Sequence, residues 1–141
     1  MAAGAWLKQQ EAMALLGGTD FTHLTTVYVA LLTGAPTDQD GSIGSVEVSG
    51  GGYARVAVST GSSYWTTPSQ SGANTPFTST NVGSISFGTS SGAWGTITYF
   101  ALMTALSGGH LIGYGAISSP PTIGTTTVVL FAAGQLTASL S

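Results

Sequence analysis

The sequence predicts a mainly β protein, an antiparallel β-sandwich or small barrel of about seven strands with one short N-terminal helix. From Thr25 onward, β-branched runs alternate with turns rich in Gly, Pro and Ser, at the short spacing typical of antiparallel β folds. Good helix formers are concentrated in the first sixteen residues. The crossover helices that a parallel sheet requires are therefore missing, and we expect a single β domain over residues 1–141.

The helix is expected at the start of the chain, in an arm over residues 1–18. Ala, Leu, Lys, Gln, Glu and Met dominate this segment, and Gly17-Gly18 supplies a C-terminal stop. Trp6, Met13 and Leu16 fall on one helical face. The pattern predicts either a short amphipathic helix docked on the sheet or an arm that packs on a neighbouring subunit.

Seven strands are expected in the rest of the chain. Their ranges are 26–32, 53–59, 82–87, 96–103, 111–117, 126–131 and 136–140, with Gly-, Pro- or Ser-rich turns between them. A long projecting loop is expected over residues 60–80, where Tyr64 and Trp65 stand among small polar residues. These two aromatic residues either cap the sandwich or contact a partner, since aromatic side chains often anchor interfaces.

Charged residues are scarce, and none follows Arg55. The seven are Lys8, Glu11, Asp20, Asp38, Asp40, Glu47 and Arg55. A net charge of −3 with two basic side chains excludes a nucleic-acid or anionic-membrane surface built on Lys and Arg. The hydrophobic content of 43% and the mean hydropathy of +0.35 favour a folded chain over a disordered one. We expect neither a transmembrane helix nor a secretory signal, because no long apolar run is present.

The residues needed for catalysis are largely missing. The chain has no Cys and holds only two histidines, His23 and His110, each beside apolar residues. Ser49 and the three glycines before Tyr53 resemble a phosphate-binding loop, but no Lys follows and the next element is a predicted strand. We therefore expect no enzymatic activity, no cofactor and no catalytic residue.

One loop shows part of a calcium-binding pattern. In a twelve-residue loop that starts at Pro36, Asp38, Asp40, Gly41 and Glu47 take positions 3, 5, 6 and 12 of the EF-hand register. Proline at position 1 contributes no side-chain oxygen, and neither flank is predicted to be helical. We predict no metal site, and calcium binding by Asp38, Asp40 and Glu47 stays an open question.

Several sequence segments that combine a turn and a strand together resemble a known family. They are 27–33 followed by Ala35-Pro36, the Gly-Gly-Gly-Tyr-Ala-Arg phrase at 50–55, Trp-Gly-Thr-Ile-Thr at 94–98, 109–112 with Gly115-Ala116, and 131–136. In this order they resemble small tailed-bacteriophage virion proteins, which are often labelled tail-fibre-like and some of which look like capsid decoration (cement) proteins. The resemblance spans nearly the whole chain and departs from the expected pattern at residues 60–80 and 124–128.

The resemblance implies a non-enzymatic structural protein of the virion. No fibre-shaft repeat or heptad is present, so we favour a decoration protein on the outer capsid surface, which binds across capsomers and stabilises the head. Its expected partners are the major capsid protein and copies of itself, with a homotrimer favoured. The alternative is a tail-fibre or tail-associated subunit involved in host receptor recognition. The expected contact residues are Trp6, Leu7, Tyr64 and Trp65.

Overall fold

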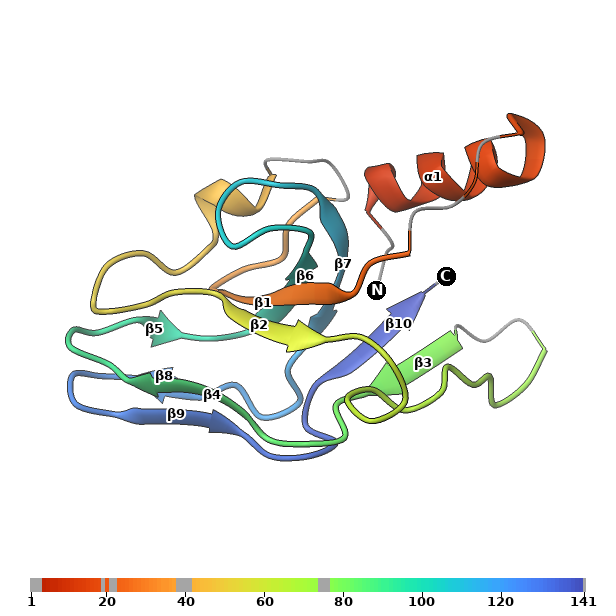
Figure 1. Cartoon of the computed structure of the whole chain (residues 1–141). Coiled ribbons are helices and arrows are strands. Elements are labelled where there is room, and N and C mark those ends of the chain that lie inside the picture. Colours follow the sequence, from red (N-terminus) through yellow and green to blue (C-terminus); the bar gives the residue numbers. More distant parts are fainter. Residues whose placement is uncertain (1–3, 19, 21–22, 38–41, 74–76, 141) are drawn as a thin grey trace.

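The computed structural model describes residues 4–18, 20, 23–37, 42–73 and 77–140. These residues form helix α1 (Ala5–Leu16), the short 3-10 helix η1 (Ser42–Ser45) and ten strands (Figure 1). The strands are β1 (Thr26–Leu32), β2 (Val56–Ser59), β3 (Phe77–Thr80), β4 (Ile85–Thr89), β5 (Gly95–Thr96), β6 (Tyr99–Met103), β7 (Leu111–Ala116), β8 (Thr122–Ile123), β9 (Val128–Phe131) and β10 (Thr137–Leu140). The predicted fold class, mainly β with antiparallel sheets and one α-helix near the N-terminus, is confirmed.

The described residues contain more strands than the seven predicted. The predicted strand 96–103 is divided between β5 and β6, because Ile97 N–H donates to Pro121 O while Thr98 N–H donates to Leu32 O, so the backbone changes partners. The short strands β3 and β8 were missed. β3 falls in the predicted 60–80 loop, so the last four residues of that loop are paired with β10 instead of projecting. Isolated bridges also join Trp65 to Asn81 and Ser69 to Thr78.

The largest sheet has four strands in the order β2-β1-β6-β7, and every pair in it is antiparallel. Three two-stranded ladders, β4-β9, β5-β8 and β10-β3, complete the β structure. In Figure 1, β4, β8 and β9 lie opposite the large sheet, and β10 and β3 lie toward the helix end of the molecule. The arrangement is that of a small β-sandwich with an additional ladder at one end.

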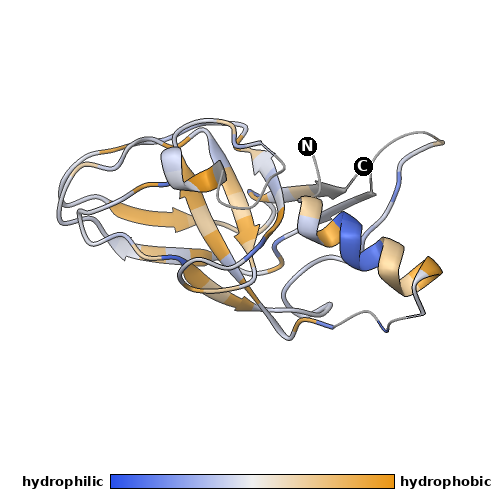
Figure 2. Ribbon diagram, turned by 90° about the horizontal axis from the view of Figure 1, so that it is seen from above, coloured by the Kyte–Doolittle hydropathy of each residue, from blue (hydrophilic) through white to orange (hydrophobic). Residues whose placement is uncertain are grey.

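Two apolar clusters cover the two faces of the large sheet. Successive residues of a strand point to opposite faces, so Val29 and Leu31 face one cluster while Ala30 and Leu32 face the other. The main core lies between the sheet and the opposite ladders, and it includes Val29, Leu31, Ile85, Trp94, Ile97, Phe100, Ile123, Val129, Phe131 and Leu136. The outer cluster is closed by Ile43 of η1 and includes Ala30, Leu32, Ala101, Met103 and Leu111. Figure 2 shows the apolar colouring of these central strands.

Helix α1 is attached to the β body at its first turn. Gly4 N–H donates to Ile112 O of β7 at 2.6 Å, and a Cβ at position 4 would lie 1.8 Å from Leu111 O, so only glycine fits this approach. Leu7 is buried beside it. The rest of the helix stands away from the sheets (Figures 1 and 2). Among the described residues, no helix combines the length and the apolar character that crossing a membrane would require.

Asn81 joins the chain before β4 to the chain before β10. Its side chain is 2% exposed; Oδ1 accepts from Leu136 N–H at 3.0 Å, and Nδ2 donates to Gly83 O and Ala132 O at 2.8 and 2.9 Å. Buried polar groups are costly when they lose their hydrogen-bond partners. This amide therefore fixes the place where the β10-β3 ladder passes into the β4-β9 ladder.

We expect Asn81→Ala to lower the free energy of unfolding by about 3 kcal/mol, because three polar groups would lose their partner, at roughly 1 kcal/mol or more each. The matched control is Val82→Ala at the neighbouring residue, which is 42% exposed and should cost less than about 0.5 kcal/mol. Urea denaturation monitored by tryptophan fluorescence measures both. Equal losses in the two variants would contradict a stabilising role for the amide.

Candidate functional site

The residues predicted to contact partners lie in two parts of the structure. Trp6 and Leu7 belong to the first turns of α1, whereas Tyr64 and Trp65 lie between β2 and β3. Trp6 is half-buried and stacks on His110, with ring centroids 5.3 Å apart and planes at 7°. Leu7 is only 7% exposed, so most of its surface packs within its own chain. The partner contacts of all four residues stay a prediction.

Backbone hydrogen bonds fix the positions of Tyr64 and Trp65. Gly61 has φ of +110°, and its carbonyl accepts from both Tyr64 N–H and Trp65 N–H at 3.0 Å. Tyr64 O accepts from Val82 N–H at 2.8 Å. Tyr64 is 47% exposed, whereas Trp65 is half-buried and packs against the main core. The two neighbouring aromatic residues line two different hollows.

The first hollow, here called the Tyr64 hollow, lies between the edges of β2 and β4. It has a volume of about 400 Å³ and is lined by Val56, Ala57, Val58, Ser59, Ser63, Tyr64, Gly83, Ser84, Ile85 and Ser86. The lining holds four serines and one exposed aromatic ring, and no charged residue. Such a surface suits a neutral ligand with many hydroxyl groups better than an ion.

The second hollow, here called the Trp65 hollow, lies between the large sheet and the β10-β3 ladder. It has a volume of about 160 Å³ and is lined by Val27, Thr60, Trp65, Pro68, Thr78, Ser79, Leu102, Ile112, Gly113 and Ala138. None of these residues is charged, and most of the surface they present is aliphatic or aromatic. The hollow therefore suits an apolar side chain.

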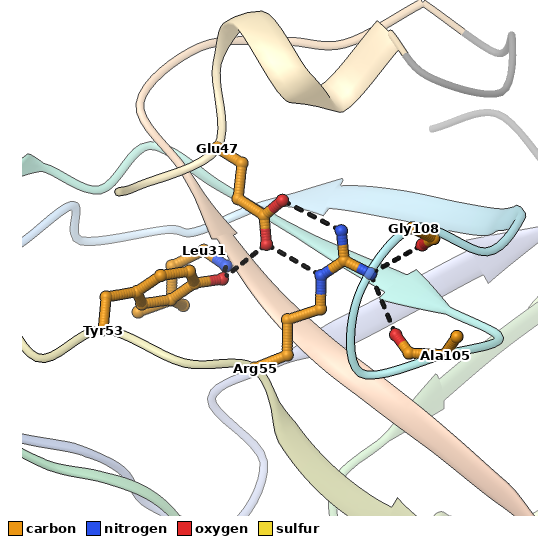
Figure 3. Close-up of polar contacts among 6 residues, drawn as sticks. All are labelled: Leu31, Glu47, Tyr53, Arg55, Ala105 and Gly108. Carbon is orange, nitrogen blue, oxygen red and sulfur yellow. Dashed lines mark hydrogen bonds and ion pairs between the residues drawn. The ribbon is translucent and has the colours of Figure 1, made fainter. Parts of the chain in front are cut away.

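A polar network fixes the segment after η1 against the large sheet (Figure 3). Arg55 donates from Nε and Nη2 to the two carboxylate oxygens of Glu47 at 2.8 and 2.9 Å. Its Nη1 donates to the carbonyls of Ala105 and Gly108, both at 2.8 Å. The Arg55 and Glu47 side chains are 7% and 16% exposed. This is the bidentate geometry in which an arginine–carboxylate pair is strongest.

Tyr53 connects the same network to β1. Its hydroxyl donates to Glu47 Oε1 at 2.9 Å and accepts from Leu31 N–H at 3.0 Å. Burial raises the pKa of the Tyr53 phenol far above its ordinary value. The hydrogen bond to Glu47 raises the pKa of the Arg55 guanidinium. The phenol therefore stays neutral and Arg55 stays charged, as a structural network requires.

This network bears on the calcium binding by Asp38, Asp40 and Glu47 that the sequence left open. Asp38, Asp40 and Gly41 lie outside the described residues. Glu47, which would have to supply the bidentate carboxylate, has both oxygens bonded to Arg55. The described residues also contain no cluster of three His, Asp or Glu side chains that could hold a metal ion. Glu47 is thus a stabilising partner of Arg55 in this structure.

Three features were not predicted from the sequence: the role of Asn81, the pairing of Glu47 with Arg55, and the Trp65 hollow. The pair did leave a signal, because Arg55 is the only basic residue after Lys8 and Glu47 precedes it by eight positions. A lone cation in so neutral a chain is expected to sit beside a carboxylate if it is buried. The Trp65 hollow left no such signal, since strands distant in sequence form its walls.

We expect Arg55→Met to lower the free energy of unfolding by about 3 kcal/mol, because removing one partner of a buried ion pair leaves the other charge uncompensated. The double variant Glu47→Gln/Arg55→Met should recover part of this loss, since the unpaired charge is gone. The control is Lys8→Met on the exposed face of α1. Chemical denaturation measures all three, and a loss no larger than that of the control would contradict the role of the network.

The model of one protein family, described as podophage GP4 fiber I protein gp80, matches residues 2–139. No curated protein matches the sequence. The matched range runs from the residues before α1 into β10, and so includes both hollows and the Glu47–Arg55 network. The resemblance to small tailed-phage virion proteins of the tail-fibre-like kind is confirmed. The chain belongs to the podophage fibre protein family that this model describes.

Proposed function

We propose that this protein is a non-enzymatic subunit of a podophage tail fibre and takes part in host receptor recognition. The observation that carries the proposal is the family match over residues 2–139, whose description names a fibre protein. The chain has a β body with two hollows at its surface and a helix that stands away from it. A fibre subunit requires both an attachment element and an exposed recognition surface.

The Tyr64 hollow supports the recognition part of the proposal. Tyr64 is exposed but its backbone is held from both sides, so its ring can offer a flat face at little entropic cost. Ser59, Ser63, Ser84 and Ser86 line the same hollow. An aromatic platform with neutral hydrogen-bonding groups suits a neutral glycan of the host surface.

Helix α1 supports the attachment part. It is joined to the body by its first turns, while its last residues, Leu15 and Leu16, are 83% and 90% exposed. Exposed apolar residues grouped in this way are typical of contact sites. We propose that the protein forms a homo-oligomer through this helix, and a trimer would agree with the expectation from the sequence.

Capsid decoration remains the second candidate. It is favoured by the described fold itself, a small β-sandwich that contains none of the extended repeats of a fibre shaft. In this role the protein would bind the major capsid protein on the outer surface of the head and stabilise the shell. The fibre description of the family favours the tail.

The position in the virion separates the two candidates. We expect gold-labelled antibody against this protein to decorate the tail in electron micrographs, and we expect quantitative mass spectrometry of purified particles to give tens of copies or fewer. Antibody against the major capsid protein is the control for head labelling. Hundreds of copies spread over the head would contradict the fibre assignment and favour decoration.

The recognition surface is tested by Tyr64→Ala. Loss of the aromatic platform should slow adsorption of the phage to its host by roughly tenfold, since an aromatic anchor contributes on the order of 1–2 kcal/mol to an interface. Leu130→Ala, at an exposed position on β9 that is 53% accessible, is the matched control. Incorporation into particles, measured by immunoblot, should be unchanged in both variants. Normal adsorption of the Tyr64→Ala phage would contradict a role of this hollow.

A further inference from the structure

The last turn of α1 carries an apolar tip, defined here as Met13, Leu15 and Leu16. These side chains are 40%, 83% and 90% exposed. Figure 2 shows the apolar colouring of this helix end, which lies away from the β body. Among the described residues of α1, the buried one is Leu7, near the opposite end of the helix, whereas Leu15 and Leu16 are strongly exposed.

The Trp65 hollow is an apolar acceptor without an occupant among the described residues. Its volume of about 160 Å³ suits an aliphatic side chain, and its walls are formed by Val27, Leu102, Ile112 and Ala138 with Trp65 and Pro68. No charged residue lines it, so an apolar group could enter without desolvating a charge. The same chain therefore exposes an apolar projection and an apolar hollow.

The geometry of α1 prevents the tip from filling the hollow of its own chain. Gly4, which begins the helix, donates to Ile112 O at 2.6 Å, and Ile112 also lines the hollow. The helix start is thus fixed beside the hollow. A helix rises about 1.5 Å per residue, so the twelve residues of α1 carry the tip about 18 Å away. The tip can therefore enter this hollow only in another molecule.

We infer that the apolar tip of α1 in one copy of this protein inserts into the Trp65 hollow of a second copy. The two surfaces are different patches of the same chain, so the contact is heterologous, and it continues from copy to copy as a closed ring or an open filament. The inference deepens the proposed fibre function and rests on it for the setting in which copies meet. The contact itself rests on the tip, the hollow and the anchored helix start.

Cysteine cross-linking tests this contact directly, because the chain has no native Cys. One variant carries Leu16→Cys at the tip and another carries Thr78→Cys, at a half-buried position in the wall of the hollow. When the two are mixed and oxidised, we expect a disulfide-linked dimer that contains one of each variant, identified by peptide mass spectrometry. The control mixture replaces the first variant with Leu130→Cys, at an exposed apolar position on β9.

The tip–hollow mixture should give at least fivefold more mixed dimer than the control mixture. A double variant with both cysteines should give a ladder of linked chains at high protein concentration. Equal yields in the two mixtures, or no mixed dimer, would overturn the contact. A double variant that closes on itself as a monomer would also overturn it, because the tip would then reach its own hollow.

A second measurement uses variants that leave the β body intact. Leu15→Ser/Leu16→Ser changes only strongly exposed side chains, and we expect it to reduce self-association, measured by sedimentation equilibrium at high protein concentration, by at least tenfold. Leu106→Ser, at a position that is 57% exposed, should leave it unchanged. Unaltered self-association of the double variant would overturn the inference. Head labelling of virions together with a positive cross-link would refute the fibre function but support the contact. Tail labelling without a cross-link would support the fibre function but refute the contact.

Discussion

Both faces of strand β1 must be covered, and much of the remaining structure follows from this constraint. Val29 and Leu31 require the opposite ladders, whereas Ala30 and Leu32 require the segment around η1. Ile43 and Val46 of that segment pack on the second face, and hydrogen bonds hold the segment as well. Glu47, which follows η1 and bridges to Leu32, is fixed by Arg55, and Tyr53 connects the same carboxylate to the backbone of Leu31. The ion pair thus secures the cover of the second face.

The scarcity of charge has a structural counterpart in this network. Arg55 and Glu47 form an ion pair with each other, and no Lys, Arg, Asp or Glu follows Arg55 in the sequence. Both hollows are lined without charged residues, so a partner could approach either without the cost of desolvating an ion. Neutral hydroxyl-rich surface around the Tyr64 hollow and apolar surface in the Trp65 hollow suit different partners. The composition thus agrees with a protein that makes several contacts in an assembly.

The sequence predicted those secondary-structure elements that depend on local residue patterns. The bounds of β1 and the end of α1 agree with the prediction, because a β-branched apolar run and a Gly-Gly stop are local signals. β3 was missed because its Thr- and Ser-rich sequence becomes a strand only by pairing with β10. For the site, Tyr64 was recognisable as an aromatic residue in a polar segment. The Trp65 hollow was not, since its walls come from strands that are far apart in sequence.

The close approach at Gly4 gives α1 a definite direction, and this bears on assembly. A helix attached by a flexible linker could place an apolar tip anywhere, whereas a helix bonded to Ile112 O presents it in one direction. Repeating a contact of fixed direction produces a regular array. Burial of one leucine side chain contributes only about 2 kcal/mol, so a single tip–hollow contact would be weak in dilute solution. In a virion that holds many copies close together, the high local concentration compensates for the low affinity of each single contact.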